Sequence, residues 1–315
     1  MPEVSVIMNC FNGERYLKEA LDSVFAQTFA DWELIFWDNA STDGSAGIAL
    51  DYWDPRVHYY RGERTVPLGA ARKLAVEVAQ GRWVGFIDTD DLWYPSKLAR
   101  QLQALDGTEH VLCYTGIHEL NPDGSVIRLV RPQYPSGEML EQQLVHYDIN
   151  MVSPLIRRSV LQHHGLTFNP EITASEEYNL FLRIIAHGTV CVLAEPLAAM
   201  RIAAGTLTDR QIARWAVERF LTLEQLEAEN PGITQRFPRA FKLAAARGEY
   251  YRARYLMHSG LVSQARAALR RIAAVDPAYR LMFALTYSRP LWKLAHSVRV
   301  KRKLLPRLWN MVAPR

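Results

Sequence analysis

The stretch Trp83-Val84-Gly85-Phe86-Ile87-Asp88-Thr89-Asp90-Asp91 passes directly from an apolar run into a cluster of acidic residues. A short apolar run that ends in polar residues is typical of a buried strand. Alternate side chains of an extended backbone point the same way, so the strand is expected to aim Asp88 and Asp90 in one direction. The stretch therefore predicts a site for chemistry at the end of a buried strand.

The sequence before this stretch alternates strand and helix patterns. Strands are predicted at 4–8, 33–37, 57–60 and 83–87, with helices at 16–27 and 68–79. Helices of this size between strands require parallel pairing, which predicts an α/β fold with a mostly parallel, doubly wound sheet and helices on both faces. Ligands of such sheets bind beyond the carboxyl ends of the strands. Three of the four predicted strand ends carry polar clusters with Asp or Asn.

The pattern loosens after Pro95. We expect a helix to about Leu105, a hairpin-like insertion with strands at 111–117 and 126–130, a helix at 175–186 and a strand at 190–193. From about Thr206 the chain is expected to be helical, with breaks at 230–232, 260 and 276–277. This predicts two domains, residues 1–205 for the sheet and residues 206–315 for a helical C-terminal region.

Composition places the chain among ordinary globular proteins. Its 315 residues are 49% hydrophobic and 22% charged, which excludes disorder, collagen and coiled coil for the whole chain. No basic leader with an apolar segment and no apolar run of membrane-spanning length is found in the sequence. Cys10, Cys113 and Cys191 are widely spaced, which favours neither a disulfide framework nor a metal knuckle. We therefore expect a cytoplasmic protein.

The basic charge is concentrated at the C-terminus. Residues 277–315 hold nine Lys and Arg and no Asp or Glu, which leaves 28 basic and 33 acidic residues in 1–276. In residues 289–315 the basic side chains alternate with Trp and Leu, as in helices that lie on anionic lipid at about 1 kcal/mol per basic residue. We expect peripheral attachment to the inner face of the plasma membrane, with a solvated terminal helix as the alternative. No module that reads nucleic acid is evident, so nucleic acid is not an expected partner.

The acidic cluster after the fourth predicted strand suits a divalent cation. Paired carboxylate oxygens bind Mg²⁺ or Mn²⁺ together with substrate phosphates, and Asp90 and Asp91 are the candidate metal ligands. Asp is also common in turns, so a turn capped by aspartates is the alternative.

Three other residues have both a functional and a structural interpretation. Phe11 can cover a nucleotide base or belong to the core. Asp38 can accept a hydrogen bond from a base or cap the following helix. Arg72 can pair with a diphosphate or be a solvated surface charge.

In combination these motifs resemble the family-2 glycosyltransferases, which use nucleotide-sugar donors and have the GT-A fold. The resemblance covers about residues 3–203. It is carried by Val4–Ile7, Phe11–Gly13, Asp38 with Ser41–Gly44, Ala71-Arg72, Asp88–Asp91 and Glu176–Tyr178.

The resemblance implies an inverting transfer of a sugar, with a role for each matching residue. Phe11 would stack on the base, Asp38 would read its edge, and Asp88 and Asp90 would hold the ribose and the metal-bound diphosphate. Glu177 falls where the family places its catalytic base. The implied donor-binding residues are Asn9, Phe11, Asn12, Asp38, Arg72, Asp88, Thr89 and Asp90.

The chemistry of sugar transfer requires the same components. Displacing a nucleoside diphosphate needs its charge neutralised, which a divalent cation provides. The attacking hydroxyl needs a carboxylate base within hydrogen-bond reach. The alternative for Glu176 and Glu177 is a favourable interaction with the N-terminal dipole of their helix.

The sequence departs from the family pattern at three positions. Asn39 stands where the family usually has a second Asp, Glu177 is one methylene longer than the usual Asp base, and Ala203 replaces a His that many members carry. If that His is a metal ligand in other members, this chain lacks that ligand.

Residues 211–215 match the QxxRW motif of processive synthases. Gln211, Arg214 and Trp215 are neighbours on one face of a helix, so an ordinary helix face is the alternative. Together with Glu176 they are candidate contacts for the acceptor.

Three function classes remain in competition. A glycosyltransferase that uses a UDP-sugar to extend a lipid-linked or surface-polysaccharide acceptor of the cell envelope accounts for most motifs. A dinucleotide-dependent oxidoreductase is disfavoured because residues 9–13 contain no GxGxxG. A non-catalytic binding protein of the same fold, which docks a partner through its helices, is the second hypothesis, prompted by Asn39 and Ala203.

Overall fold

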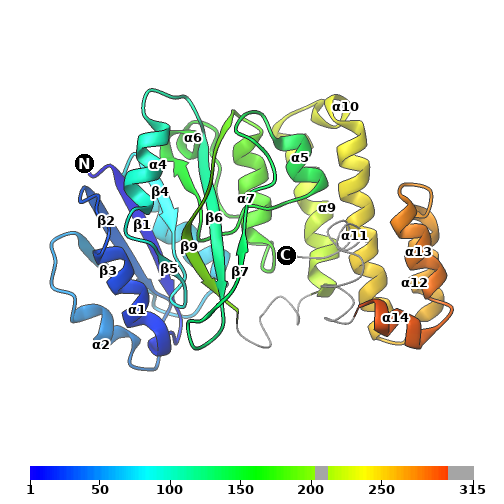
Figure 1. Ribbon diagram of the computed structural model, residues 1–315, viewed down its shortest axis with the longest axis horizontal. Helices are drawn as coiled ribbons and strands as arrows, with labels where there is room; N and C mark the ends of the chain where they lie inside the picture. The colour runs from blue at the N-terminus through cyan, green and yellow to red at the C-terminus, as the bar shows by residue number, and fades with distance from the viewer. Residues whose placement is uncertain (203–211, 297–315) are drawn as a thin grey trace. The chain divides into compact units, whose positions relative to one another are not determined.

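The computed structural model describes residues 1–202 and 212–296, and the chain divides into two compact units (Figure 1). The first unit comprises 1–139 and 149–204, and the second comprises 140–148 and 205–315. The segment 140–148 therefore belongs with the helical C-terminal residues, although the sequence placed it in the first domain.

A nine-stranded sheet forms the first unit. Its order is β3-β2-β1-β4-β8-β6-β9-β5, and β7 pairs with β6 beside this path. The strands are β1 Val4–Cys10, β2 Trp32–Asp38, β3 Val57–Arg61, β4 Trp83–Phe86, β5 Leu92–Trp93, β6 Leu112–Leu120, β7 Val126–Val130, β8 Leu155–Arg157 and β9 Val190–Arg201. β1 to β4 are mutually parallel and β6 is parallel to β9, whereas β8, β7 and β5 pair antiparallel. The predicted mixed α/β sheet, with most of its pairing parallel, is confirmed.

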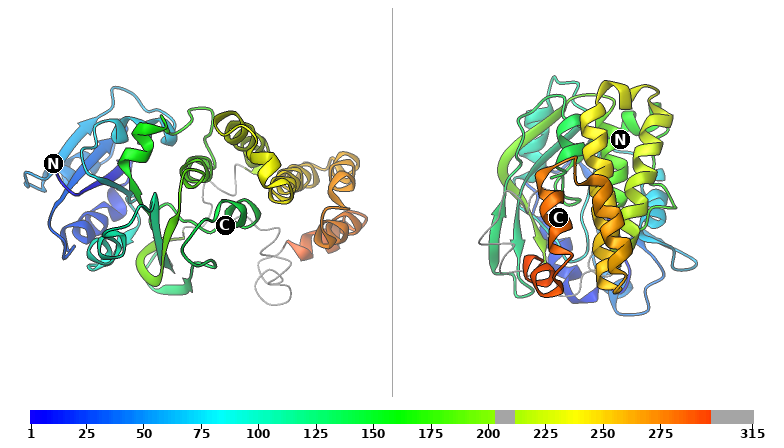
Figure 2. Two further views of the ribbon diagram at one scale, coloured as in Figure 1. Left: turned by 90° about the horizontal axis from the view of Figure 1, so that it is seen from above. Right: turned by 90° about the vertical axis from the view of Figure 1, so that its right-hand side faces the viewer.

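The central strand β1 shows how the sheet is covered. All seven of its residues are buried, which requires helices on both faces of the sheet (Figure 2). Val4, Val6 and Met8 belong to the same apolar cluster as the buried side chains of α1 (Glu14–Phe25). From the other set of β1 residues, Ser5 donates to Glu33 Oε1 and accepts the N–H of Gly81 at 2.7 Å. The second face thus combines the apolar side chain of Ile7 with buried hydrogen bonds at Ser5.

The remaining helices of the first unit are mostly those expected. They are α2 Ser45–Leu50, α3 Leu68–Glu77, α4 Lys97–Leu105, α6 Arg158–His163 and α7 Glu176–Ile185. The sequence indicated a helix after Asp38, where α2 lies, but gave no bounds for it, and it did not predict α6, β5 and β8. Elements of two to six residues carry too little periodicity to identify. The predicted strand at 190–193 continues as β9 to Arg201 past an irregularity in its pairing with β6 at Gly116.

The second unit is helical throughout its described part. Its helices are α5 Leu140–Val145, α9 Ile212–Glu229, α10 Ile233–Arg236, α11 Pro238–His258, α12 Val262–Ile272, α13 Pro277–Leu285 and α14 Arg289–Ala295. α11 is the central helix and contacts α5, α9 and α12. Gly232 and Gly260 have positive φ angles of 89° and 79° at the predicted breaks. Among residues 1–202 and 212–296, no helix combines the length and the apolar character needed to cross a bilayer.

Candidate active site

The acidic stretch after β4 forms a turn. β4 ends at Phe86, and Ile87 still donates to Ile7 of β1 at 3.0 Å, which holds the start of the turn in the sheet. The N–H of Asp91 then donates to the carbonyl of Asp88 at 3.1 Å. The expectation of an extended backbone through Asp88 and Asp90 is therefore wrong, and a tight turn brings the acidic residues together instead.

The carboxylates of this turn lie close enough to affect one another. Burial raises the pKa of Asp90, and the charge of Asp88 raises it further. The pKa of Asp91 lies well above its usual range because the group is buried beside Asp88 and Asp90. Crowded carboxylates of this kind favour a cation or a shared proton between them.

Asp90 and Asp91 differ in their partners. Asp91 accepts the backbone N–H of Arg201 at 3.0 Å, so one of its oxygens is used to anchor β9 to the turn. For the carboxylate of Asp90, the only hydrogen-bond partner within residues 1–202 and 212–296 is its own backbone N–H. Of the two candidate metal ligands, Asp90 has the oxygens available.

Arg201 holds this turn through several contacts. Its Nε donates to the carbonyl of Asp90 at 3.1 Å, and its Nη2 forms an ion pair with Glu19 at 2.8 Å. Its guanidinium also lies 4.1 Å from the ring centre of Tyr16. No local sequence pattern assigns these contacts to Arg201, because its partners are distant in the chain. Ala203 lies outside the described residues.

Arg72 is the buried cation of the site. It comes from α3, is 4% exposed and donates from Nη2 to Asp88 Oδ1 at 2.7 Å. Asp88, Glu176 and Glu177 all stabilise its charged form and outweigh the effect of burial, so its pKa is raised. The alternative of a solvated surface charge is wrong for this residue.

Two glutamates at the start of α7 lie beside Arg72. Glu176 is buried, and its Cγ is 3.1 Å from where a Cβ on Gly69 would be, so a glycine in α3 permits this close approach. Burial, and next the charge of Glu176, raise the pKa of Glu177 to about 7. A carboxyl group with such a pKa can accept a proton near neutral pH.

The loop after β1 presents an aromatic ring and a braced asparagine. Phe11 is 53% exposed, so the alternative that it belongs to the core is wrong. Asn12 has a φ of 53°, and its Oδ1 accepts the N–H of Thr42 at 2.8 Å. Asn9 is buried, and its Nδ2 has no hydrogen-bond partner among the residues that the structure describes.

Thr89 also contacts this loop. A Cβ on Gly13 would be 2.6 Å from Thr89 Oγ1, so the threonine packs against the glycine that precedes α1. The two loops after β1 and β4 are therefore in direct contact at Gly13 and Thr89.

Asp38 at the end of β2 is satisfied by protein partners. It is fully buried, and Oδ2 accepts from the hydroxyl of Tyr59 at 2.6 Å and from Arg61 at 3.0 Å. Oδ1 accepts the N–H of Ser41 at 2.7 Å. Burial alone would raise the pKa of Asp38, but these hydrogen bonds outweigh it and lower the pKa. Gly44 rather than Asp38 occupies the N-cap position of α2, so the helix-cap alternative is wrong.

The sequence missed the roles of Tyr59, Arg61 and Asn39. Arg61 ends β3 opposite Asp38, and Tyr59 lies two residues earlier on the same strand, so only the β2–β3 register reveals them. Asn39 donates from Nδ2 to the carbonyl of Val66 at 2.8 Å and accepts the N–H of Val66 at 3.0 Å. An aspartate accepts but does not donate when ionised, so this clasp explains why an amide stands at position 39.

The residues of the QxxRW match lie in the other unit. Gln211 is outside the described residues, whereas Arg214 and Trp215 are on α9. Trp215 is buried and packs edge-on against Tyr251 with ring centres 5.5 Å apart. This packing agrees with the helix-face alternative for Trp215.

A metal ion at this site would depend on its substrate for ligands. Among residues 1–202 and 212–296, no group of three or more His, Cys, Asp or Glu side chains is arranged to hold a metal ion. The acidic turn nevertheless provides hard carboxylate oxygens, from Asp90 and from the Oδ2 of Asp88, next to a buried arginine. Such a set fits Mg²⁺ or Mn²⁺ if phosphate oxygens and water complete the coordination.

Sequence comparisons identify related proteins. The family model described as glycosyl transferase family 2 matches residues 5–165. The chain is 28% identical over 214 residues to a putative teichuronic acid biosynthesis glycosyltransferase of Bacillus subtilis, TuaG, with 67% of this chain and 83% of that protein covered. It is 27% identical over 190 residues to the Escherichia coli protein WfgD, named as a UDP-Glc:alpha-D-GlcNAc-diphosphoundecaprenol beta-1,3-glucosyltransferase, with 60% and 72% covered.

Another relative is much longer. An uncharacterized glycosyltransferase of Rickettsia conorii is 28% identical over 216 residues, which are 68% of this chain but 35% of that protein. The chain thus spans about a third of the length of this relative.

Solved structures share the fold at low sequence identity. Residues 1–349 of S. aureus TarS, in complex with UDP-GlcNAc, match with a TM-score of 0.68 and 18% identity over 92% of this chain and 88% of that one. The mannosyltransferase PcManGT from Pyrobaculum calidifontis, in complex with GDP-Man and Mn²⁺, matches with a TM-score of 0.53 and 16% identity over 93% and 86%. The GT-A architecture expected from the sequence is therefore confirmed.

Proposed function

The chain belongs to glycosyl transferase family 2 and is a glycosyltransferase, and on that premise we propose that it transfers a sugar, with inversion, from a nucleotide-sugar donor to an acceptor hydroxyl. The observation that carries the proposal is the convergence of Arg72, Asp88 and Glu177 from three separate elements, with the pKa of Glu177 raised to about 7. This arrangement places an ion pair, Arg72 with Asp88, beside a carboxylate that can accept a proton.

The donor occupies the carboxyl ends of β1, β2 and β4. Phe11 stacks on the base, which its exposure permits. Asp38 accepts a hydrogen bond from the base edge in addition to those from its protein partners, since an ionised carboxylate offers about four acceptor positions. Asn12 and Thr89 lie in the loops after β1 and β4, and Asn9 lies near the end of β1. A UDP-sugar is the favoured donor because the name of the E. coli relative WfgD specifies UDP-Glc.

The diphosphate lies at the acidic turn with Mn²⁺ or Mg²⁺. Asp88 and Asp90 would hold this cation, whose charge would neutralise the leaving nucleoside diphosphate. Asp91 instead fixes the turn through its bond to Arg201. Arg72 holds the Asp88 carboxylate in place through their ion pair at 2.7 Å.

Glu177 acts as the base. The acceptor oxygen forms a bond to the anomeric carbon, its proton passes to the Glu177 carboxylate, and the bond from the anomeric carbon to the diphosphate oxygen breaks. Glu176 raises the pKa of Glu177, which makes the carboxylate a stronger proton acceptor. Glu176 therefore assists the base in addition to being a candidate acceptor contact.

The acceptor is a lipid-linked or surface-polysaccharide glycan handled at an anionic membrane surface. Support comes from α13 and α14 and the turn between them, where Leu281, Tyr287, Leu291 and Leu294 are exposed apolar residues. Arg289 and Lys293 lie among them. Exposed apolar side chains beside cations are suited to the interface of an anionic bilayer.

The non-catalytic alternative has lost one of its two supports. Asn39, which suggested a degenerate donor site, is accounted for by its two hydrogen bonds to Val66. The other support, Ala203, lies outside the described residues.

A calorimetric titration tests the donor site directly. UDP and GDP are titrated with and without Mn²⁺ into wild-type protein and Asp90→Ala, followed by a screen of UDP-sugars for transfer. We expect UDP binding that depends on metal and is lost in Asp90→Ala. If neither nucleotide binds under any condition, the donor assignment is wrong.

A further inference from the structure

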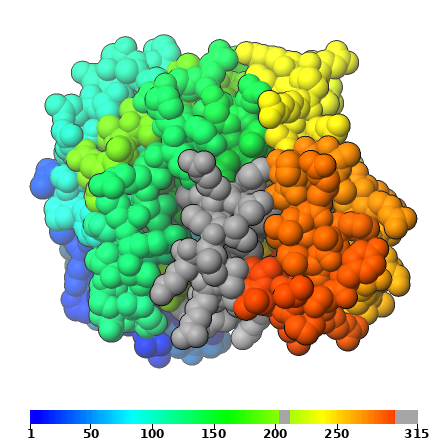
Figure 3. All heavy atoms as spheres, turned by 45° about the vertical axis from the view of Figure 1, so that its right-hand side comes forward, coloured from blue at the N-terminus to red at the C-terminus, as the bar shows by residue number. Residues whose placement is uncertain are grey.

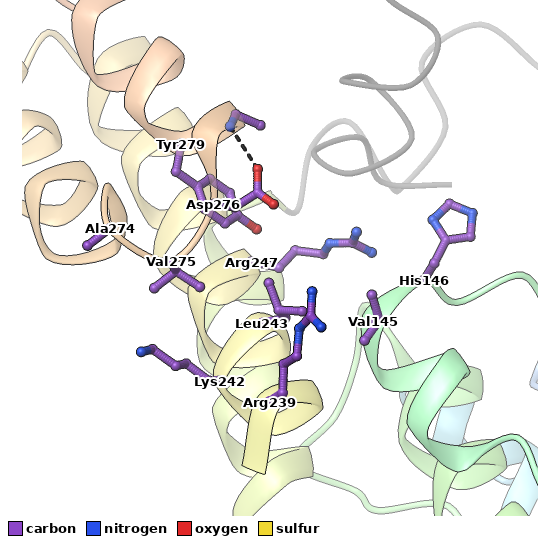
Figure 4. Close-up of a pocket in the computed structure, with 11 residues that line it drawn as sticks. Val145, His146, Arg239, Lys242, Leu243, Arg247, Ala274, Val275, Asp276 and Tyr279 are labelled. Carbon is purple, nitrogen blue, oxygen red and sulfur yellow. Dashed lines mark hydrogen bonds between the residues drawn. The ribbon is translucent and has the colours of Figure 1, made fainter. Parts of the chain in front are cut away.

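A cavity of about 330 Å³ lies within the helical unit, and the described residues that line it include none of those assigned to the donor (Figure 4). Its lining comes from three places, namely the end of α5 with His146, one face of α11, and the segment 274–279 that leads into α13. This volume is at the lower end of the range for ligand pockets, roughly 300–1,000 Å³.

Cations dominate the lining. α11 contributes Arg239, Lys242 and Arg247, which share a helix face through spacings of three, five and eight residues. Asp276 is the single carboxylate among the described lining residues, and it already accepts the N–H of Ala278 at 2.7 Å to cap α13. The three cations and one carboxylate give the lining a formal charge of +2, leaving His146 out of the count.

One of the three cations is held in place, and the other two are exposed. Arg247 is 6% exposed and hydrogen-bonds to Tyr279, so its guanidinium is already held in place. Arg239 and Lys242 are exposed, and no ion-pair partner of either is found among residues 1–202 and 212–296. In Figure 4 the side chains of Arg239 and Arg247 both extend from α11 toward Val145.

This combination matches a phosphoryl group. A planar guanidinium donates two parallel hydrogen bonds to phosphate oxygens, and a buried one loses little freedom on binding. A doubly charged phosphate monoester would neutralise the excess, whereas a single carboxylate would leave a net charge. Leu243 and Val275 provide apolar surface for the substituent of the ester.

We propose that this cavity is a binding site for the phosphoryl group of a phosphate ester. The proposal goes beyond the proposed function, because it concerns the helical unit and its test requires no sugar transfer. The phosphoryl group belongs either to a lipid headgroup or to a soluble phosphate ester, and the two sources are distinguished by experiment.

The soluble source is tested by calorimetric titration of glycerol 3-phosphate into the full chain in the presence of EDTA, which suppresses metal-dependent binding at the acidic turn. The lipid source is tested by co-flotation with phosphatidylcholine vesicles, with and without phosphatidic acid. Both are repeated on the double variant Arg239→Gln/Lys242→Gln. Both side chains are exposed, so the fold is expected to be retained.

Arg252→Gln provides the matched control. Arg252 is an exposed arginine on the same helix that does not line the cavity, so its substitution removes the same type of charge. We expect one of the two probes to bind wild type and Arg252→Gln equally, and the double variant at least tenfold more weakly. Failure of both probes to bind, or equal binding by the double variant, would overturn the proposal. Because EDTA excludes metal-dependent donor binding, loss of UDP binding in a separate titration leaves this result unaffected.

Discussion

The acidic turn of the sheet unit and the basic cavity of the helical unit both gather like charges, but they differ in burial. At the acidic turn and at the start of α7, burial is the largest cause of the raised pKa values of Asp90, Asp91 and Glu177. In the basic cavity, Arg239 and Lys242 are exposed, so water screens their repulsion. Where groups of like charge are buried, their pKa values therefore shift. Where they are exposed, they only attract a ligand of opposite charge.

The largest effect is expected from removing the base. Glu177→Gln keeps the size of the side chain and removes its ability to accept a proton. We expect kcat for sugar transfer to fall by about 10² to 10⁴-fold with UDP binding retained. Steady-state kinetics with the best UDP-sugar and calorimetry with UDP measure the two quantities. A variant with wild-type kcat would show that Glu177 is not the base.

The pH dependence of wild type tests the same carboxylate without mutation. A base with a pKa of about 7 is protonated and inactive below that pH, so kcat/KM is expected to rise about tenfold per pH unit below 7 and to level off above it. Initial rates between pH 5 and 9, with a buffer series of constant ionic strength, give the profile. A midpoint near the ordinary 4.5 of glutamate would remove the argument from burial.

The raised pKa of Glu177 also affects stability. The folded protein holds the proton more tightly than the unfolded chain, so stability falls as pH rises from about 4.5 to about 7 and changes little beyond. The Glu177→Gln variant lacks this loss. The free energy of unfolding of the variant relative to wild type should therefore increase between pH 4.5 and pH 7. Urea unfolding of both proteins at pH 4.5 and pH 8 measures this effect. If the difference in unfolding free energy between variant and wild type is the same at both pH values, the prediction is wrong.

The sequence predicted most residues of the site but not their burial, ion pairs or hydrogen-bond partners. Asp88, Asp90 and Glu177 were identified from motifs, and the strand ends that carry the first two followed from apolar periodicity. That Arg72 is buried and paired depends on the packing of α3 against the sheet, which no local pattern records. The partners of Asp38 depend on strand register, and the basic cavity on how α5, α11 and α13 meet. Residues 140–148 were misplaced because their contacts are with helices far along the chain.

Removing the buried cation Arg72 should lower the stability of the protein and raise the pH midpoint of its activity. Arg72→Met keeps an apolar stem but leaves Asp88 without its ion-pair partner. We expect a loss of about 2 kcal/mol in the free energy of unfolding, less than the 3–5 kcal/mol of a fully buried pair, because the Asp88 side chain is 36% exposed. Urea denaturation measures this loss. The pH midpoint of the residual activity should also move upward, since Arg72 stabilises the ionised Glu177.

A smaller effect is expected at Asn39. Asn39→Asp restores the residue that the family usually has, but an ionised aspartate has no donor for the carbonyl of Val66. We expect a loss of about 1 kcal/mol in unfolding free energy, because the partly buried carbonyl of Val66 loses its donor. Asn39→Ala loses both bonds and is the control, and a stable Asn39→Asp protein would show that the clasp contributes little.

The smallest effect is expected from neutralising the exposed cations, and it tests the comparison itself. Arg239→Gln/Lys242→Gln removes two like charges that water already screens, so the free energy of unfolding should change by no more than about 0.5 kcal/mol. The same double variant should show a wild-type pH profile of sugar transfer to a soluble acceptor, because these residues contribute nothing to the pKa of Glu177. Urea denaturation at low and high salt measures the first quantity. A large stabilisation at low salt would show that these cations repel each other as strongly as buried ones, and burial would then no longer explain the difference between the two regions.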